Sequence, residues 1–189
     1  MAAHALTALR LLLVIPFAVL MAGSGAAGAA WAALVLAAAV ATDLLDGMAA
    51  RRHGTASPAG RLFDHLTDVL FVVGGLAAGA LRGAFPPVLP LLVALAFAQY
   101  VIDSYWLDRA GRLRPSRLGR LNGILYFAPL GGDILVRLGA QALAPLVTAL
   151  AWLLVASTLG SMGERLAAVV RARGAGASPG GGTGGRWPR

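Results

Sequence analysis

The chain alternates between long apolar runs and short polar segments. Runs without a charged side chain cover residues 11–42, 69–81, 83–102, 121–132 and 138–163. Several of them reach the roughly 20 residues that an α-helix needs to cross a bilayer. The first run is too long for one ordinary span. Gly23, Gly25 and Gly28 weaken a helix near its middle, so we expect two helices joined by a tight turn there.

This pattern predicts six helices, near residues 5–22, 29–52, 58–81, 86–108, 117–137 and 140–168. Hydrophobic residues make up 58% of the chain and charged residues 13%, whereas soluble proteins have roughly 45–50% and about 25%. We therefore expect an all-α polytopic membrane protein, built as a bundle of six transmembrane helices. We assign this membrane domain to residues 1–173 and expect the glycine-rich stretch 174–189 to be a disordered tail.

The basic residues are distributed unevenly between the loops. All 16 are arginines, and only Arg82 and Arg137 fall outside the N-terminus, the second and fourth connections and the C-terminal part. An excess of arginine in short loops marks the cytoplasmic side. We therefore expect both termini at the cytoplasmic face of the plasma membrane. The net charge of +8 then reflects topology and contact with membrane lipids, and no aromatic residues interleave with the arginines as a nucleic-acid surface requires.

The apolar run that follows Arg10 also has features of a cleaved signal peptide. Cleavage would remove the helix that gives an even number of spans with both ends on one side. We therefore expect the segment to be retained as the first span.

Half of the eight acidic residues lie in the 26-residue window from Asp43 to Asp68. On helices, the aspartates and several small or basic residues near them lie at three- and four-residue steps, so they form two stripes, each on a single helix face. The first stripe consists of Asp43, Asp46, Gly47, Ala50 and Arg51, and the second of Gly60, Asp64 and Asp68. The short connection between the two helices makes them antiparallel neighbours, so the stripes should face each other at the cytoplasmic edge of the membrane.

Carboxylates at a membrane edge need a positive partner. The chain has no cysteine, so thiolate metal sites are excluded. Oxygen ligands favour Mg²⁺ or Mn²⁺, and two divalent ions would match the charge of four carboxylates. Sites with two metal ions clamp a phosphate during its displacement, so the expected substrate carries a diphosphate. Close helix packing is the alternative explanation for the small residues Gly47 and Ala50.

The window resembles the signature of the CDP-alcohol phosphotransferase family, D-x-x-D-G-x-x-A-R-x(8)-G-x-x-x-D-x-x-x-D. Every fixed position and the eight-residue gap are present between Asp43 and Asp68. The resemblance implies a transferase that moves a phosphatidyl group from CDP-diacylglycerol to a small polar alcohol and releases CMP. It also implies a six-helix fold that often forms homodimers.

The resemblance assigns roles to the matching positions. Asp43, Asp46, Asp64 and Asp68 would hold two Mg²⁺ or Mn²⁺ ions, and Asp68 would also be the catalytic base for the acceptor hydroxyl. Gly47, Ala50, Arg51 and Gly60 would form the pocket for the CDP moiety.

The acceptor alcohol is indicated by looser likenesses. The opening residues 6–10 with Pro16, and the segment from Ser116 to Arg120, are similar to phosphatidylglycerophosphate synthases. We therefore expect glycerol 3-phosphate as the acceptor, bound by Arg117 and Arg120, with inositol phosphate or another alcohol as the alternative. Each of these arginines is explained equally well as part of a solvated cytoplasmic loop.

Two other classes of membrane protein use intramembrane aspartates. A membrane prenyltransferase would carry its aspartate motifs on two separated helices in different halves of a larger bundle. A divalent-cation transporter would need polar residues along the depth of its path. The single continuous segment from Asp43 to Asp68 favours the phosphatidyl transferase over both.

Overall fold

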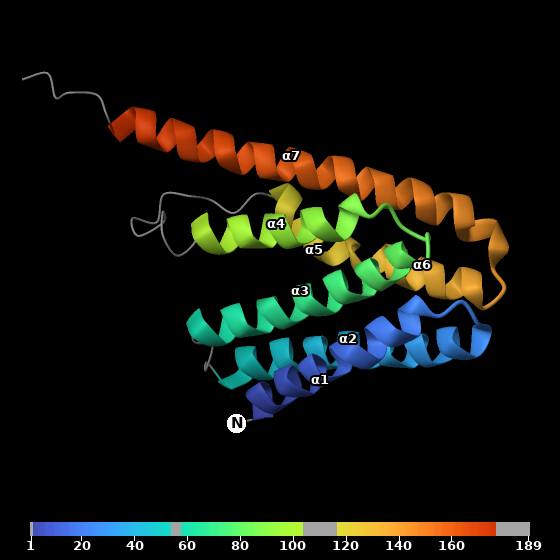
Figure 1. Cartoon of the computed structure of the whole chain (residues 1–189). Coiled ribbons are helices and arrows are strands. Elements are labelled where there is room, and N and C mark those ends of the chain that lie inside the picture. The colour runs from blue at the N-terminus through green and yellow to red at the C-terminus, as the bar shows by residue number, and fades with distance from the viewer. Residues whose placement is uncertain (1, 54–57, 104–116, 177–189) are drawn as a thin grey trace, which may run out of the picture.

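The computed structural model is a bundle of α-helices (Figure 1). The structure describes residues 2–53, 58–103 and 117–176, and for residues 2–7, 45–53, 58, 59, 61, 117 and 172–176 it describes the backbone alone. The helices are α1 (Ala2–Ala22), α2 (Ala26–His53), α3 (Pro58–Leu81), α4 (Val88–Ile102), α5 (Arg117–Leu125), α6 (Phe127–Arg137), the short 3₁₀ helix η2 (Gln141–Leu143) and α7 (Ala144–Gly176). The described ranges contain no strand, so the predicted all-α class is confirmed.

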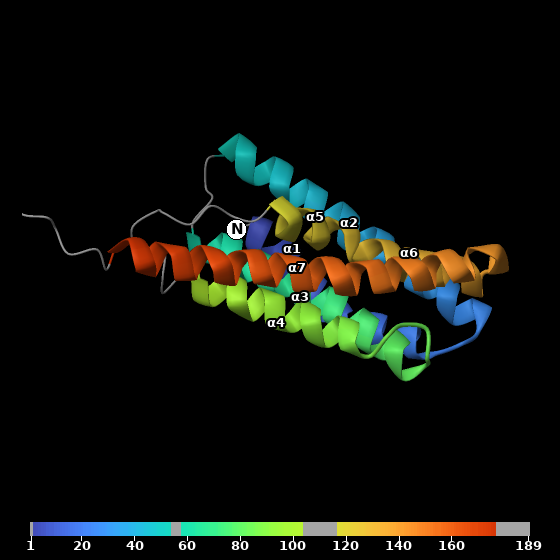
Figure 2. The same ribbon diagram turned by 90° about the horizontal axis from the view of Figure 1, so that it is seen from above.

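The helices lie side by side, and the start of α1 and the end of α7 lie at the same end of the bundle in both views (Figures 1 and 2). Helix α1 packs most extensively against α3 and also against α2, while α7 packs against α4, α5 and α6. The last turns of α2 and the first turns of α3 lie at the same end as the start of α1 (Figure 1). This arrangement brings the two predicted stripes to one end of the molecule.

The helices fit a membrane protein in length and composition. Within the described residues, three segments are long and apolar enough to span a bilayer: Ala26–Leu44, Leu62–Leu81 and Gln141–Arg171. Shorter apolar segments lie at Ala8–Ala22 and Val88–Ile102. Outward-facing leucine and isoleucine side chains on α1, such as Leu12 at 73% and Ile15 at 74% exposure, suit contact with lipid. The count of six spans and the side of the termini stay predictions.

The fifth predicted helix, near 117–137, is divided in the structure. Helix α5 ends at Leu125, Tyr126 forms a turn, and α6 begins at Phe127. Pro129 explains the break, because it has no N–H to donate to the carbonyl of Leu125 and its ring clashes with that carbonyl. The prediction of one continuous helix was therefore wrong.

Aromatic and small residues join α1, α3 and α6 in the core. The rings of Phe17 and Phe71 stack with their centroids 4.3 Å apart. A Cβ atom added to Gly75 would lie 2.5 Å from the ring of Phe17 and 3.0 Å from Leu130. Gly79 makes a similarly close approach to the ring of Phe85. These glycines therefore serve packing within the chain.

An ion pair lies at the end of the bundle remote from the aspartate stripes. Arg82 Nη2 lies 2.5 Å from Asp133 Oδ2, and Arg82 Nε donates to the carbonyl of Met21. Arg137 Nη2 donates to the carbonyls of Leu20 and Gly25. The carbonyls of Leu20 and Met21 lie in the last turn of α1, so these arginine donors satisfy groups that the helix leaves without partners. The two arginines outside the arginine-rich segments thus tie α1, α3 and α6 together.

Candidate functional site

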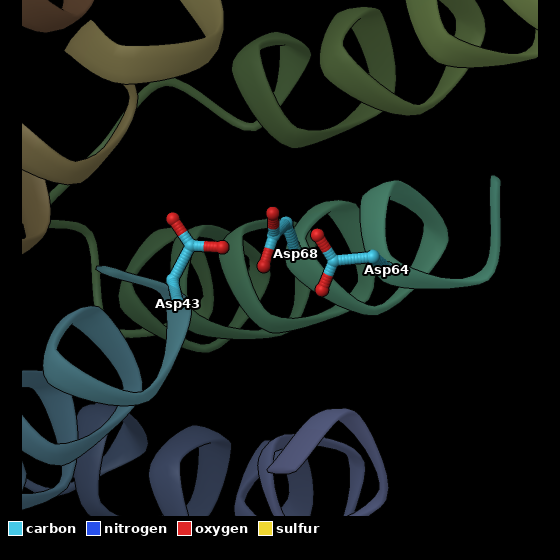
Figure 3. Close-up of side chains that lie close together, drawn as sticks. All are labelled: Asp43, Asp64 and Asp68. Atoms are coloured by element: carbon cyan, nitrogen blue, oxygen red, sulfur yellow. The ribbon is translucent and has the colours of Figure 1, made fainter. Parts of the chain in front are cut away.

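Three of the four predicted metal ligands converge in the structure. Asp43 comes from α2, and Asp64 and Asp68 come from adjacent turns of α3, with their carboxylates pointing toward one another (Figure 3). One carboxylate oxygen from each lies within 4.8 Å of the others. Residues four apart share a helix face, so Asp64 and Asp68 lie on one face of α3. We name these three residues the carboxylate cluster.

The other predicted site residues are described less fully. Helix α2 continues through His53, which keeps the backbone of its stripe on one helix. The side chains of Asp46, Ala50 and Arg51, and the surroundings of Gly47, lie outside the described part of the structure. Gly60 lies in the first turn of α3 and is partly buried. Among the acceptor candidates, Arg120 is exposed on α5, and the side chain of Arg117 is outside the description.

An arginine from α1 lies at the centre of the carboxylate cluster. Arg10 is 1% exposed. Its Nη1 atom lies 3.0 Å from Asp64 Oδ1 and also contacts Asp68 Oδ1, and its Nη2 atom lies 3.3 Å from Asp43 Oδ1. One guanidinium group therefore bridges carboxylates on two different helices. The planar fork of arginine suits this geometry, since its donors point in fixed directions.

Arg10 is a site residue that was not predicted. In the sequence it stands as one of the N-terminal arginines that mark the cytoplasmic side and as part of the family-like opening. The signal was nevertheless present, because Arg10 is the one arginine or lysine in the whole of α1 and no acidic residue accompanies it. An ionisable residue inside an apolar span marks a functional site by default, and this rule would have selected it.

A comparison with known protein families shows to which family the chain belongs. A family model described as CDP-alcohol phosphatidyltransferase matches residues 1–160. The chain belongs to the CDP-alcohol phosphatidyltransferase family. No curated protein and no solved structure matches it. Family membership makes the protein a transferase of phospholipid biosynthesis that moves a phosphatidyl group from a CDP-alcohol to an alcohol, and the family uses divalent metal ions.

The carboxylate cluster fits the metal ions that CDP-alcohol phosphatidyltransferases use. Oxygen ligands bind Mg²⁺ at about 2.1 Å, so two ligands on one ion lie at most about 4.2 Å apart. The oxygens of Asp43, Asp64 and Asp68 lie within 4.8 Å of one another, and small side-chain movements would close the difference. Hard oxygen donors are the ligand type that Mg²⁺ and Mn²⁺ prefer. These residues could therefore hold a divalent ion.

A second arginine, Arg165 on α7, is linked to α3 through aromatic side chains. The guanidinium carbon of Arg165 lies 5.2 Å from the centroid of the Tyr100 ring. That ring contacts His65, the neighbour of Asp64 on α3, with centroids 5.4 Å apart. A Cβ atom at Gly119 would lie 2.9 Å from Arg165 Nη2, so the glycine makes room for the arginine. Arg165 is thus separated from the α3 aspartates by two aromatic rings.

The carboxyl of Asp103 lies at the end of α4, in the same region. Burial raises the pKa of this carboxyl, and the positive charge of Arg165 lowers it in part. Gln99 on the same helix donates from Nε2 to the carbonyl of Met162, 3.2 Å away. This hydrogen bond joins α4 to α7.

Polar side chains also join α5 and α7. Ser157 Oγ donates to Asn122 Oδ1 over 2.7 Å, and the hydroxyls of Tyr126 and Thr158 lie 2.8 Å apart. Asn122 is 2% exposed. Hydrogen bonds between helices at this depth satisfy groups that lipid cannot. They fix the position of α7, and with it Arg165, relative to the segment that carries Gly119.

Proposed function

We propose that this protein transfers the phosphatidyl group of CDP-diacylglycerol to glycerol 3-phosphate, with release of CMP. The observation that carries the proposal is the convergence of Asp43, Asp64 and Asp68, at the spacing of the family signature, on one end of a helical bundle. A diphosphate substrate explains why a membrane protein concentrates carboxylates there, since metal ions bridge the two kinds of anion.

The aspartates are the proposed ligands of two Mg²⁺ or Mn²⁺ ions. Asp43, Asp64 and Asp68 supply the oxygens that the structure describes, and Asp46 lies one turn along α2 from Asp43. When bound, such ions neutralise charge on the diphosphate and on the departing CMP. Gly47, Ala50, Arg51 and Gly60 are the proposed pocket for the CDP moiety, where small residues allow close approach and an arginine suits phosphate.

Asp68 is the proposed general base. The acceptor hydroxyl oxygen forms a new bond to the phosphatidyl phosphorus, and the bond from that phosphorus to the oxygen of CMP breaks. The hydroxyl proton passes to the Asp68 carboxylate. Asp68 lies one helical turn farther from the start of α3 than Asp64. This position suits a base that acts where the lipid headgroup meets the acceptor. Holding both substrates in line supplies much of the rate enhancement in reactions of this kind.

An anionic acceptor is supported by arginines on α7 and α5. Arg165 is linked to α3 through Tyr100 and His65, and Arg117 and Arg120 lie in the first turn of α5. A phosphate group on the acceptor would match this positive region, as it would for glycerol 3-phosphate or inositol phosphate. An alcohol without a phosphate group, such as inositol or serine, would leave the arginines without that partner.

The remaining expectations from the sequence form part of the same proposal. The site would face the cytoplasm at the plasma membrane, as the distribution of the arginines indicates. The membrane domain would cover residues 1–173, and the protein would act as a homodimer.

The proposed activity can be tested with purified protein in detergent micelles or vesicles. We expect CMP release from CDP-diacylglycerol in the presence of Mg²⁺ or Mn²⁺ and glycerol 3-phosphate, and none after chelation of the metal. A panel with inositol phosphate, inositol and serine tests the acceptor. A preference for inositol phosphate would mean that this compound, and not glycerol 3-phosphate, is the acceptor. Release of pyrophosphate would indicate a prenyltransferase. Transport of Mn²⁺ without release of CMP would contradict the proposal.

Arg165 provides a test of the acceptor site. Replacing Arg165 by Gln removes one charge-assisted contact to the acceptor phosphate, so we expect the KM for glycerol 3-phosphate to rise about tenfold. The KM for CDP-diacylglycerol should stay within about twofold, because uniform binding of one substrate alone is lost. Arg171→Gln is the matched control, since Arg171 is exposed on the same helix and its Nε donates to the carbonyl of Ala167. An unchanged acceptor KM in Arg165→Gln would place the phosphate elsewhere.

A further inference from the structure

Arg10 is the one basic side chain that the structure places inside the carboxylate cluster, within the described residues. It is buried and it contacts all three carboxylates. We propose that Arg10 is a positioning residue that acts as an internal counter-ion of the metal-free cluster, and that a divalent cation binds in competition with it. This inference rests on the proposed metal site and adds a role for a residue outside the family signature.

The charges of the described residues explain why such a counter-ion is needed. Asp43, Asp64 and Asp68 together carry three negative charges, and each is at least partly shielded from water. Like charges at these distances repel one another, and burial strengthens the repulsion. Arg10 offsets one of the three charges and contacts every member of the cluster. In the absence of metal, Arg10 therefore stabilises an arrangement that would otherwise drive the carboxylates apart.

The contacts of Arg10 place it where a cation would have to lie. Each carboxylate meets the guanidinium group through its Oδ1 atom. A cation that takes one oxygen from each residue must either replace Arg10 at these atoms or bind beside it. In both cases a divalent charge and a guanidinium charge compete for the same three anions.

Arg10 has two opposing effects on metal affinity. It holds the ligands together, which favours binding, and it repels the cation, which opposes binding. The carboxylates are already brought together by the packing of α1 against α2 and α3, so the ordering that Arg10 adds is small. The repulsion is larger, because Coulomb energy scales with the product of the charges and the ion carries two. Competition should therefore dominate.

The test uses the full chain, purified in detergent without lipid substrate, and Mn²⁺ as the probe. Replacing Arg10 by Gln should tighten Mn²⁺ binding by about tenfold or more, measured by electron paramagnetic resonance of free Mn²⁺. The same variant should lose thermal stability in metal-free buffer and recover most of the loss at saturating Mn²⁺, because the cation then supplies the missing positive charge. Arg10→Lys retains the charge, and its Mn²⁺ affinity should stay within about threefold of the wild-type value.

Arg82→Gln is the matched control, because Arg82 is also an ion-paired arginine at a helix interface but lies at the opposite end of the bundle. It should lose similar stability with and without Mn²⁺ and leave Mn²⁺ affinity unchanged. If Arg10 merely supported the fold, Arg10→Gln would behave in the same way, and that result would overturn the inference. Failure of Arg10→Gln to fold even with saturating Mn²⁺ would also overturn it. Absence of Mn²⁺ binding to the wild type would instead remove the metal site itself.

Discussion

Replacing Asp64 by Asn is expected to lower the rate of CMP release from CDP-diacylglycerol by about a thousandfold. The amide keeps the size of the carboxyl group but removes the charge, and the neutral oxygen is a weaker ligand for Mg²⁺ or Mn²⁺. Metal ions at a phosphoryl centre stabilise transition-state charge by several kcal/mol, and each 1.36 kcal/mol corresponds to about a factor of ten in rate. The loss should therefore appear in kcat, measured at saturating metal and substrate.

The fold should tolerate this substitution. Asp64 is one of three carboxylates around Arg10, so removal of its charge still leaves Arg10 with Asp43 and Asp68. We expect the unfolding temperature to change by a few degrees at most. Glu164→Gln is a control for the chemical change itself, because Glu164 is exposed on α7, and its activity should stay within about twofold of wild type. Retention of more than a tenth of the activity by Asp64→Asn would exclude this residue as an essential ligand.

The convergence of the carboxylates could be anticipated from the sequence because the information is local. The four-residue step from Asp64 to Asp68 fixes a shared helix face. The short connection before α3 predicts that α2 and α3 run antiparallel and close together. In the structure α1 packs against both α2 and α3, and Asp43 lies close to Asp64 and Asp68 on α3. The same reasoning could not place the side chain of Asp46, which lies outside the described part of the structure.

The role of Arg10 could not be anticipated in this way. Arg10 lies 54 residues before Asp64 and 58 before Asp68 along the chain, and no spacing rule relates them. Their contact depends on how α1 is rotated against α3. Packing far from the site determines this rotation, notably the stacking of Phe17 on Phe71 and the close approach of Phe17 to Gly75.

The break between α5 and α6 had a local signal that hydropathy concealed. The run 121–132 is uncharged and was interpreted as part of one span, although Pro129 stands inside it. A proline at that position removes a backbone donor whatever the hydropathy of its neighbours. The consequence for the site is that α5, with Gly119 and Arg120, can take a direction different from that of α6. The position of Arg165 beside Gly119 therefore depended on packing that the sequence did not reveal.

Arginine thus has a structural use at one end of the bundle and a proposed chemical use at the other. At the structural end, replacing Arg82 by Met is expected to lower the free energy of unfolding by about 3 kcal/mol, because it leaves a buried carboxylate without its partner. The side chain of Asp133 is 6% exposed and that of Arg82 is 18% exposed, so solvent screens the pair only weakly.

The expected loss can be measured by denaturant titration of the protein in detergent micelles, with kcat of the folded fraction as a second reading. The kcat should be unchanged, because the pair lies at the end of the bundle remote from the carboxylate cluster. The double variant Arg82→Met with Asp133→Leu removes both charges and should recover most of the stability, since replacing a whole buried ion pair by apolar residues is often neutral. If Arg82→Met alone were as stable as wild type, Asp133 would have to find its positive partner in Arg137, the other arginine that the structure describes at that end, and the tie between α3 and α6 would need a different explanation.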